Sequence, residues 1–242
     1  MVEVGFKSDK GLKRSNNEDA FFVIPETNIF MVADGVGGNN AGEIASRTTI
    51  SKIVEYIRNN ALKNDFTEAE VKGYFFRCIE KVNKSVYDLS KIQPENTGMA
   101  TTATIVYVAA NNAYIVNIGD SRAYIFRKGI LTQVTEDHTY VNELIREGAI
   151  TKEEARLHEK KNVITKAIGG EEKASPDFFC AGTEKDDIIV LCTDGLHGEI
   201  GDDNIRSILE AGGSMVDICS SLVNKANQCG GRDNVTVICL KI

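Results

Sequence analysis

Residues 100–134 read ATTATIVYVAANNAYIVNIGDSRAYIFRKGILTQV, and this stretch decides the fold class. Its runs of Val, Ile, Tyr, Phe and Thr are typical of strands, and only AANNA, GDS and RKG separate them. A crossover between parallel strands needs about a dozen residues or more, and none of these separators is that long. The stretch therefore predicts an antiparallel meander.

Regular patterns continue on both sides of the meander and indicate an α+β fold. Apolar residues spaced three and four apart predict helices, and two shorter helical patterns interrupt the strands after residue 134. We interpret residues 135–175 as a flap inserted over one edge of the core, and we expect one domain over residues 1–242. The most economical arrangement is a layered sandwich of two antiparallel sheets with helices outside. The predicted strands are 2–6, 20–24, 28–33, 187–193 and 234–242, and the predicted helices are 41–62, 67–92, 139–147, 151–158 and 215–229.

The composition is that of a soluble globular protein. Hydrophobic residues make up 42% and charged residues 26% of the 242 residues, which excludes a disordered or collagen-like chain. The net charge is −7 and no basic run is present, which argues against a nucleic-acid binder but leaves open a phosphate bound through a cation. The first residues lack the apolar core of a signal peptide, and no apolar stretch reaches the roughly 18–20 residues that cross a bilayer. We expect a cytoplasmic protein without membrane contact, whose six cysteines are reduced thiols.

Acidic residues gather at the ends of the predicted strands. A carboxylate at the mouth of a buried strand is costly unless a positive group meets it, and a divalent cation with oxygen ligands would neutralise several at once. Asp-Gly is also a common turn signal, so a single pair is better explained as a turn. Several such acids together favour a metal–carboxylate site. They are Glu18 and Asp19 before one strand, Asp34 and Asp194 each ending a strand ahead of a glycine, Asp120 after Gly119, and Asp233 before the last strand.

Eight segments resemble, in order, the motifs of one enzyme family. They are similar to those of the metal-dependent serine/threonine protein phosphatases of type 2C, in the compact bacterial form. The resemblance covers essentially the whole chain and implies a four-layer α-β-β-α sandwich. The segments are SDKGLKRSNNEDA (8–20), MVADGVGGNNAGEIAS (31–46), TGMATTAT (97–104), NIGDSRAY (117–124), TEDHT (135–139), NVITKAIG (162–169), LCTDGL (191–196) and GGRDNVTVI (230–238).

This resemblance implies a set of metal ligands. Asp34 matches an aspartate that bridges two Mn²⁺ or Mg²⁺ ions, and Gly35 matches a residue whose carbonyl binds one of them. Asp194 and Asp233 match ligands of the other ion. Asp120 matches an aspartate that helps Asp194 to hold a third, weaker ion.

Four further positions match residues around the ions. Glu18 matches an acid that contacts the metal and its waters, and Asp19 matches a neighbouring acid. Asn234 matches an asparagine beside the site. Arg14 matches the arginine that binds the substrate phosphate, a task that suits a planar guanidinium.

The activity implied by the resemblance is hydrolysis of phosphoserine and phosphothreonine monoesters in proteins, by direct attack of a metal-bridging water. Two metals would lower the pKa of that water and clamp the phosphoryl oxygens, so an acidic protein could bind phosphate. The family also implies phosphorylated proteins as partners, among them a cognate serine/threonine kinase whose signalling is opposed in a bacterial cytoplasm. We expect a monomer.

One position departs from the family pattern. Asn39 stands where many members have a histidine proposed as general acid, and an amide cannot deliver a proton at neutral pH. A metal-bound water or another residue would then protonate the leaving group, or turnover would be reduced. His138 is a candidate for this role or else an anchor of the flap, whereas His158 and His197 are interpreted as local structural residues.

Two rival functions stay open on sequence alone. A scaffold protein with this fold and no turnover would have lost metal ligands and would bind Mn²⁺ weakly or without consequence, whereas Asp34, Asp194 and Asp233 are all present. A nucleotide-using enzyme is disfavoured because GVGGNNAG at 35–42 lacks the Lys-Ser/Thr of a phosphate-binding loop.

Overall fold

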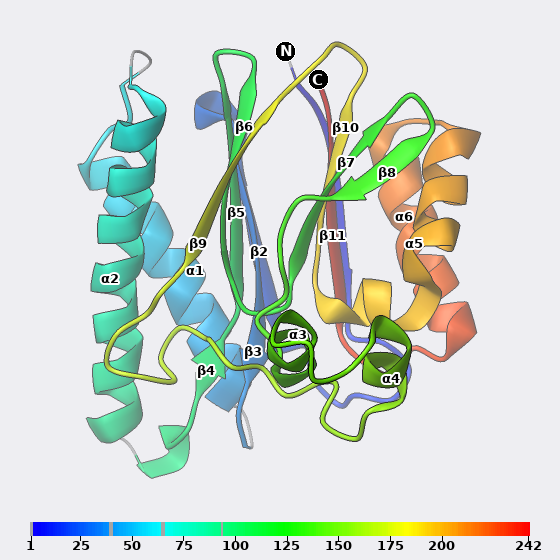
Figure 1. The fold of residues 1–242 in the computed structure, drawn as a ribbon. Coiled ribbons are helices and arrows are strands. Elements are labelled where there is room, and N and C mark those ends of the chain that lie inside the picture. Colours follow the sequence, from blue (N-terminus) through cyan, green and yellow to red (C-terminus); the bar gives the residue numbers. More distant parts are fainter. Residues whose placement is uncertain (1, 39–40, 64–65, 93) are drawn as a thin grey trace.

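Two antiparallel sheets lie face to face at the centre of the computed structural model, which describes residues 2–38, 41–63, 66–92 and 94–242 (Figure 1). The first sheet has the strand order β1 (Glu3–Asp9), β11 (Val235–Lys241), β10 (Ile188–Cys192), β7 (Arg122–Arg127) and β8 (Ile130–Gln133). The second has the order β2 (Asp19–Ile24), β3 (Ile29–Val36), β5 (Ala103–Ala109), β6 (Asn112–Ile118) and β9 (Asp177–Gly182), and β4 (Ala100–Thr101) also pairs with β3.

Helices cover the outer face of each sheet, as the sequence predicts. In Figure 1 the pair α1 and α2 flanks one side and the pair α5 and α6 flanks the other, so the layers run helix, sheet, sheet, helix. None of the helices in the described ranges combines the length and the hydropathy that a bilayer crossing requires. The bounds of these four helices are Ala41–Asn59 for α1, Glu68–Ile92 for α2, Asp194–Ala211 for α5 and Met215–Cys229 for α6.

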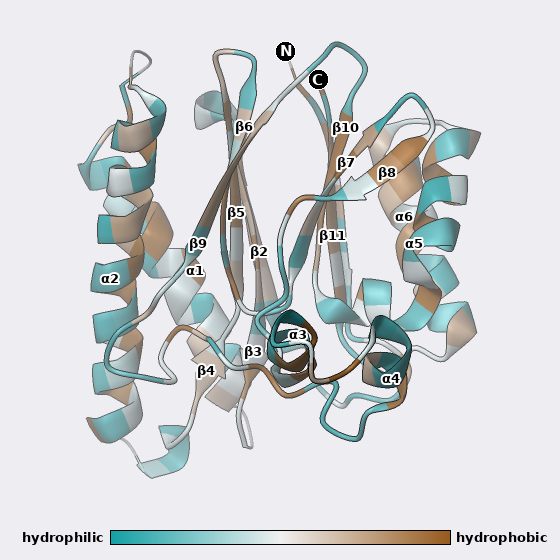
Figure 2. Cartoon of the chain, viewed as in Figure 1, coloured by the Kyte–Doolittle hydropathy of each residue, from teal (hydrophilic) through white to brown (hydrophobic). Residues whose placement is uncertain are grey.

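Apolar side chains fill the interfaces between the layers. One cluster packs the second sheet against α1 and α2, and another packs the first sheet against α5 and α6. Figure 2 shows hydrophobic patches on these helices alternating with hydrophilic ones. A further cluster, with Phe30, Leu191 and Ile238 among its members, lies between the two sheets. Because both faces of each sheet are covered, β10 is buried along its whole length rather than at alternate positions.

The prediction of one continuous meander over residues 100–134 is wrong. Strands β5 and β6 form one hairpin and β7 and β8 form another, but β6 and β7 belong to different sheets. The chain changes sheet at residues 119–121, which we call the Asp120 turn. Gly119 permits this turn because its φ is +103° and a Cβ there would lie 2.5 Å from the Thr102 side chain. A short separator thus allows a change of sheet as well as a hairpin.

Two elements lie outside the predicted set. Strand β9 occupies a stretch that the sequence leaves without a strand, and it pairs with β6. Helix α5 begins immediately after β10 and contains three glycines, which have low helix propensity. It bends at Gly201, whose φ is +64° and which divides the helix into two parts.

The segment between β8 and β9 contains two short helices, α3 (Tyr140–Arg146) and α4 (Lys152–Leu157). Figure 1 shows them at one end of the sandwich. Isolated backbone bridges join Thr139 to Ile164 and Thr101 to Ile168, so the two ends of the segment lie against each other and against β4. Its interpretation as a flap of a single domain over residues 1–242 stays a prediction.

Candidate metal centre

The predicted acidic residues come together at one end of the sandwich, where strands of both sheets begin or end. Asp19 begins β2 and faces Asp34 of β3 directly in the strand register. The Asp120 turn joins the sheets at the same end. Asp194 begins α5 after β10, and Asp233 precedes β11. Like charges directly opposite one another destabilise a strand pair, so this arrangement needs compensation.

Threonines fix the backbone around Asp34. The Asp34 amide donates to the Thr102 hydroxyl over 2.9 Å, and the Thr101 hydroxyl donates to the Asp34 carbonyl over 2.8 Å. Thr102 also shares a hydrogen bond of 2.7 Å with Ser121 in the Asp120 turn. Only the pairing of β3 with β4 brings both threonines to Asp34.

Asp19 is buried, and one of its two carboxylate oxygens has hydrogen-bond partners among the described residues. Its Oδ2 accepts hydrogen bonds from the hydroxyls of Thr193 over 2.9 Å and Thr236 over 2.7 Å. Its Oδ1 has no hydrogen-bond partner among the described residues, and neither has Oδ1 of Asp194. Thr193 is the N-cap of α5, but its hydroxyl binds Asp19 instead of capping the helix. Two buried carboxylate oxygens are therefore left for a further donor or a cation.

Arg14 is the one predicted site residue with a positive charge. Its Nη2 lies 2.7 Å from Oδ2 of Asp233, and its side chain is about half exposed, with 49% of its surface accessible. Asp233 in turn accepts the Asn234 amide over 2.8 Å. The guanidinium therefore lies at the rim of the acidic group, with donors still available to solvent.

Gly42 has no side chain, which leaves a space beside Glu18 and Gly35. A Cβ on Gly42 would lie 2.7 Å both from Oε2 of Glu18 and from the Gly35 carbonyl oxygen. Asn234 fixes Glu18 by accepting its amide over 2.8 Å, and it also donates to the carbonyls of Lys10 and Asn16. Asn234 thus joins the start of β11 to the connection between β1 and β2 beside the site.

Burial raises the pKa of each of four aspartates. The pKa of Asp19 rises to about 7, with the charge of Asp194 adding to the effect of burial and the threonine hydroxyls opposing it. Burial and the charge of Asp194 raise the pKa of Asp120 to about 8. Burial and the charge of Asp233 raise the pKa of Asp194 to about 6. The pKa of Asp34 lies well above its usual range because of burial and of the charges of Asp19 and Asp194.

These residues fit hard divalent cations that keep part of their water. Within the described residues, no three Asp, Glu, His or Cys side chains are grouped closely enough to enclose one ion by themselves. Mg²⁺ characteristically binds one or two carboxylates and retains several waters, and carboxylate, carbonyl and water ligands suit Mn²⁺ as well. The unpartnered carboxylate oxygens, the raised pKa values and the space beside Gly42 are consistent with such shared sites.

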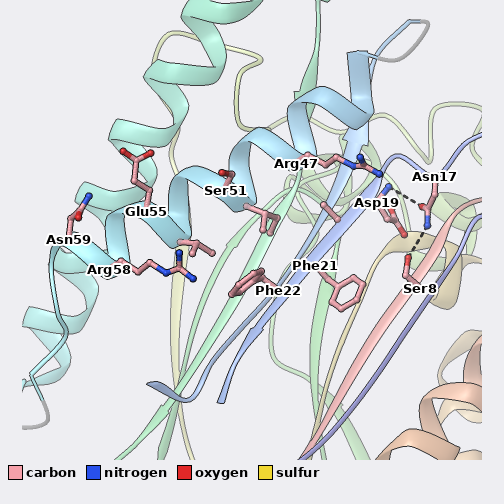
Figure 3. Close-up of a pocket in the computed structure, with 13 residues that line it drawn as sticks. Ser8, Asn17, Asp19, Phe21, Phe22, Arg47, Ser51, Glu55, Arg58 and Asn59 are labelled. Atoms are coloured by element: carbon pink, nitrogen blue, oxygen red, sulfur yellow. Dashed lines mark hydrogen bonds between the residues drawn. The ribbon is translucent and has the colours of Figure 1, made fainter. Parts of the chain in front are cut away.

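A pocket of about 710 Å³ lies behind this acidic group, between α1 and the strands β1 and β2 (Figure 3). Asp19 contributes to its wall, but Asp34, Asp194 and Asp233 are not among its described lining residues. Phe21 and Phe22 form an apolar side, and Arg47 and Arg58 extend from α1. Asn17 connects the pocket wall to the site, since it accepts the Asp19 amide and donates to Ser8.

A family model for protein phosphatase 2C matches residues 12–233, with the acidic positions inside the match. The chain belongs to this family. It is 34% identical over 236 residues to the serine/threonine phosphatase stp of Listeria monocytogenes, with 96% of this chain and 93% of that protein covered. The structure of the Streptococcus agalactiae serine/threonine phosphatase superposes with a TM-score of 0.92 at 32% identity over the full length of both chains.

A metal-bound relative agrees with the chemistry of the site. The phosphatase PstP, whose catalytic domain was solved in complex with two manganese ions, matches with a TM-score of 0.86 and 32% identity over 99% of this chain and 97% of that chain. The phosphatase fold and family predicted from the sequence are therefore confirmed. The residue roles are not tested by these comparisons, and Asn39 lies outside the described residues.

The histidines of this phosphatase have local partners. His138 is buried with both ring nitrogens within hydrogen-bond distance of other groups, and Nε2 of His197 contacts the Asp120 carbonyl. His158 ends α4 and accepts the Lys160 amide. Of the two alternatives for His138, the anchoring role fits this geometry better, because a general acid needs a ring nitrogen free to reach the substrate.

Proposed function

We propose that this protein is a Mn²⁺- or Mg²⁺-dependent phosphatase that hydrolyses phosphoserine and phosphothreonine in proteins. The observation that carries the proposal is the acidic group contributed by both sheets, four of whose aspartates have raised pKa values. Such a group costs free energy unless cations meet it, and the family has metal-bound members.

The ions would supply Lewis acidity, which makes water more acidic and offsets the charge on the phosphoryl oxygens. In this proposal Asp34 would hold ions from the second sheet, helped by the Gly35 carbonyl and Glu18. Asp194 and Asp233 would hold them from the first sheet. Asp120 would share a weaker third ion with Asp194, since the Asp120 turn joins the two sheets.

Arg14 binds the substrate phosphate in this proposal. Its half-exposed guanidinium keeps donors free while one nitrogen contacts Asp233, which orients the planar group. A water oxygen would bond to phosphorus as the bond from phosphorus to the serine or threonine oxygen breaks, and a water would protonate that leaving oxygen, because His138 and His197 are engaged elsewhere.

The names of the relatives support a proposal on the physiological setting. Bacterial proteins with full-length similarity are named serine/threonine phosphatases. We propose phosphorylated proteins as substrates, a cognate serine/threonine kinase among them, and a monomer acting in the cytoplasm. The segment 135–175 acts as the flap that contacts those proteins.

The test is hydrolysis of p-nitrophenyl phosphate and of a phosphothreonine peptide with Mn²⁺, with Mg²⁺ and with EDTA. Activity should require the metal and should fall to the EDTA level in Asp194→Asn and in Asp34→Asn. Asp203→Asn is the matched control, because Asp203 lies on the same helix as Asp194 with a side chain that is 96% exposed. Near-normal turnover of Asp194→Asn would contradict the proposed metal site, and a folded, metal-bound but inactive wild-type protein would favour a scaffold.

A further inference from the structure

Two histidines hold the Asp120 turn from different sides. His138 comes from the start of the segment interpreted as a flap, and His197 comes from α5, one helical turn after Asp194. The turn is confined further because Gly119 packs on Thr102, and because Ser121 bonds Thr102 and Thr104. The backbone that carries the Asp120 carboxylate therefore has little freedom to move.

His138 and Gly119 exchange two hydrogen bonds. The His138 amide donates to the Gly119 carbonyl over 3.0 Å, and the Gly119 amide donates to Nδ1 of His138 over 3.0 Å. A backbone amide can only donate, so Nδ1 must be unprotonated and the neutral ring carries its proton on Nε2. This tautomer suits the surroundings, since Nε2 lies 3.0 Å from Oδ2 of Asp177.

The partners of His138 connect both ends of the flap segment. Asp177 begins β9, just beyond that segment, and its other oxygen lies 3.5 Å from Lys166. Lys166 also lies 3.3 Å from Nε2 of His138, but an ammonium only donates, so Asp177 is the group that joins Lys166 to the ring. The His138 carbonyl also accepts the amide of Thr165 over 2.8 Å. The entrance and the exit of the segment therefore meet at the ring that holds Gly119.

His197 contacts the turn one residue further along the chain, at Asp120. Its Nε2 lies 3.0 Å from the carbonyl oxygen of Asp120. A carbonyl can only accept, so Nε2 of His197 also carries the ring proton. The helix that begins with Asp194 is thereby joined to the turn that carries Asp120.

We propose that His138 and His197 are positioning residues that hold the Asp120 carboxylate beside Asp194 for a shared cation, and that His138 links this turn to both ends of the flap. The inference rests on the proposed function, because it takes Asp120 as a metal ligand. It assigns neither histidine a proton transfer. It requires only that one ring nitrogen of each histidine stays at its observed place.

The test uses amides that imitate one ring nitrogen at a time. In His138→Asn the Asn oxygen replaces Nδ1 and can still accept the Gly119 amide, whereas the longer side chain of His138→Gln places its oxygen elsewhere. In His197→Gln the side-chain NH₂ replaces Nε2 and can still donate to Asp120, whereas that of His197→Asn is too short. His158→Asn is the control, because His158 accepts a backbone amide far from the turn.

Two readouts are measured. The first is hydrogen exchange of the Gly119 amide in metal-free protein, which should accelerate by about tenfold or more in His138→Ala and His138→Gln but not in His138→Asn. The second is the Mn²⁺ concentration for half-maximal hydrolysis of p-nitrophenyl phosphate. This Mn²⁺ concentration should rise about tenfold in His138→Ala, His197→Ala, His138→Gln and His197→Asn, while KM for the substrate stays unchanged. In His138→Asn and His197→Gln it should stay at the wild-type value.

Each outcome decides the proposal. It is overturned if the alanine variants keep wild-type Gly119 exchange and Mn²⁺ requirement, or if nitrogen NMR of the wild-type protein finds the proton of His138 on Nδ1. If an alanine variant does not fold, nitrogen NMR of the histidine rings in the wild-type protein still tests the proposed hydrogen bonds. A wild-type protein without metal-dependent activity would refute the proposed function, while Gly119 exchange in metal-free protein would still test the two-histidine arrangement.

Discussion

Arg14 contacts Asp233 through one nitrogen, and about half of its side-chain surface is exposed. Its side chain can therefore be removed without disrupting the packing of the fold. We predict that Arg14→Ala raises KM for a phosphopeptide about tenfold or more, because the proposed role of Arg14 is to donate hydrogen bonds to the charged substrate phosphate. The free energy of unfolding should change little. Steady-state kinetics check the first expectation and urea unfolding the second. Lys13→Ala is the control, since Lys13 is the exposed neighbour, and an unchanged KM in Arg14→Ala would exclude phosphate binding by this residue.

Gly35 tolerates no side chain. A Cβ there would lie 2.0 Å from the Gly42 carbonyl oxygen and 2.7 Å from that of Glu18, both backbone atoms that cannot rotate away. We predict that Gly35→Ala lowers the free energy of unfolding by about 3 kcal/mol, measured by urea denaturation. Gly38→Ala should change it by less than about 0.5 kcal/mol, because no described atom lies within 4 Å of a Cβ at Gly38. Equal effects of the two substitutions would mean that the close approach of α1 to β3 is dispensable.

At the scale of elements, an ion pair fixes the start of β10 to β7. Arg127 contacts both carboxylate oxygens of Asp187, over 2.8 Å and 2.6 Å, and the Asp187 side chain is buried. Burial alone would raise the pKa of Asp187, but hydrogen bonds from Arg127 and from the Glu184 amide outweigh it and lower the pKa. The charged form is therefore favoured by the folded state.

We predict that Asp187→Asn lowers the free energy of unfolding by about 2 kcal/mol at pH 7. A carboxyl whose pKa is lowered on folding stabilises the protein above its unfolded pKa, and this contribution disappears as pH falls through the folded pKa. The difference between wild type and variant should therefore be full at pH 7 and shrink below about pH 4. Denaturation at several pH values measures it. A difference that grows on acidification would contradict the ion pair.

Much of the element order could be predicted from the sequence, and the errors have physical causes. Helix α6 follows its predicted range because one apolar stripe is bounded by Ser214, which caps it, and by Gly230. Helix α5 could not be predicted with the same rules because glycines interrupt it. The pairing of β6 with β9 could not be predicted because it joins residues that are distant in the chain.

The acidic side chains of the site could be predicted, because each lies at the end of a recognisable strand. The groups that hold them could not. Thr193 and Thr236 reach Asp19 only through the pairing of β10 with β11 and the stacking of the two sheets. Nor does the spacing of His138, His197 and Gly119 along the chain indicate that they meet. Sequence patterns locate charge, whereas hydrogen-bond partners depend on tertiary structure.

For the whole molecule, metal removal should act through the acidic group. The pKa values of Asp194, Asp19 and Asp120 are raised to about 6, 7 and 8 in the metal-free folded protein. Folding therefore favours the protonated carboxyls, and the metal-free protein loses stability as pH rises from about 4 towards 8. His138 and His197 oppose this trend, because their lowered pKa values make the folded state lose stability as pH falls below about 6.5.

The histidines contribute to the Tm both of the metal-free and of the Mn²⁺-bound protein. Their contribution therefore cancels when the increase in Tm on adding Mn²⁺ is measured. We predict that this increase is small at pH 5 and grows steadily to pH 8, since the cations must displace protons from the carboxyls. Differential scanning calorimetry at matched ionic strength measures it. Asp120→Asn should reduce the increase at pH 8, and an increase independent of pH would argue against binding by these aspartates.

The layer of side chains between the sheets also acts as a spacer. Asp34 belongs to one sheet, whereas Asp194 and Asp233 border strands of the other, so the thickness of that layer sets how far apart the two halves of the site stand. Protein interiors are close-packed, and a change in side-chain volume at Phe30, Leu191 or Ile238 must be absorbed by movement of the sheets. Under the proposed function, the size of core residues that never touch the substrate would therefore affect activity as well as stability.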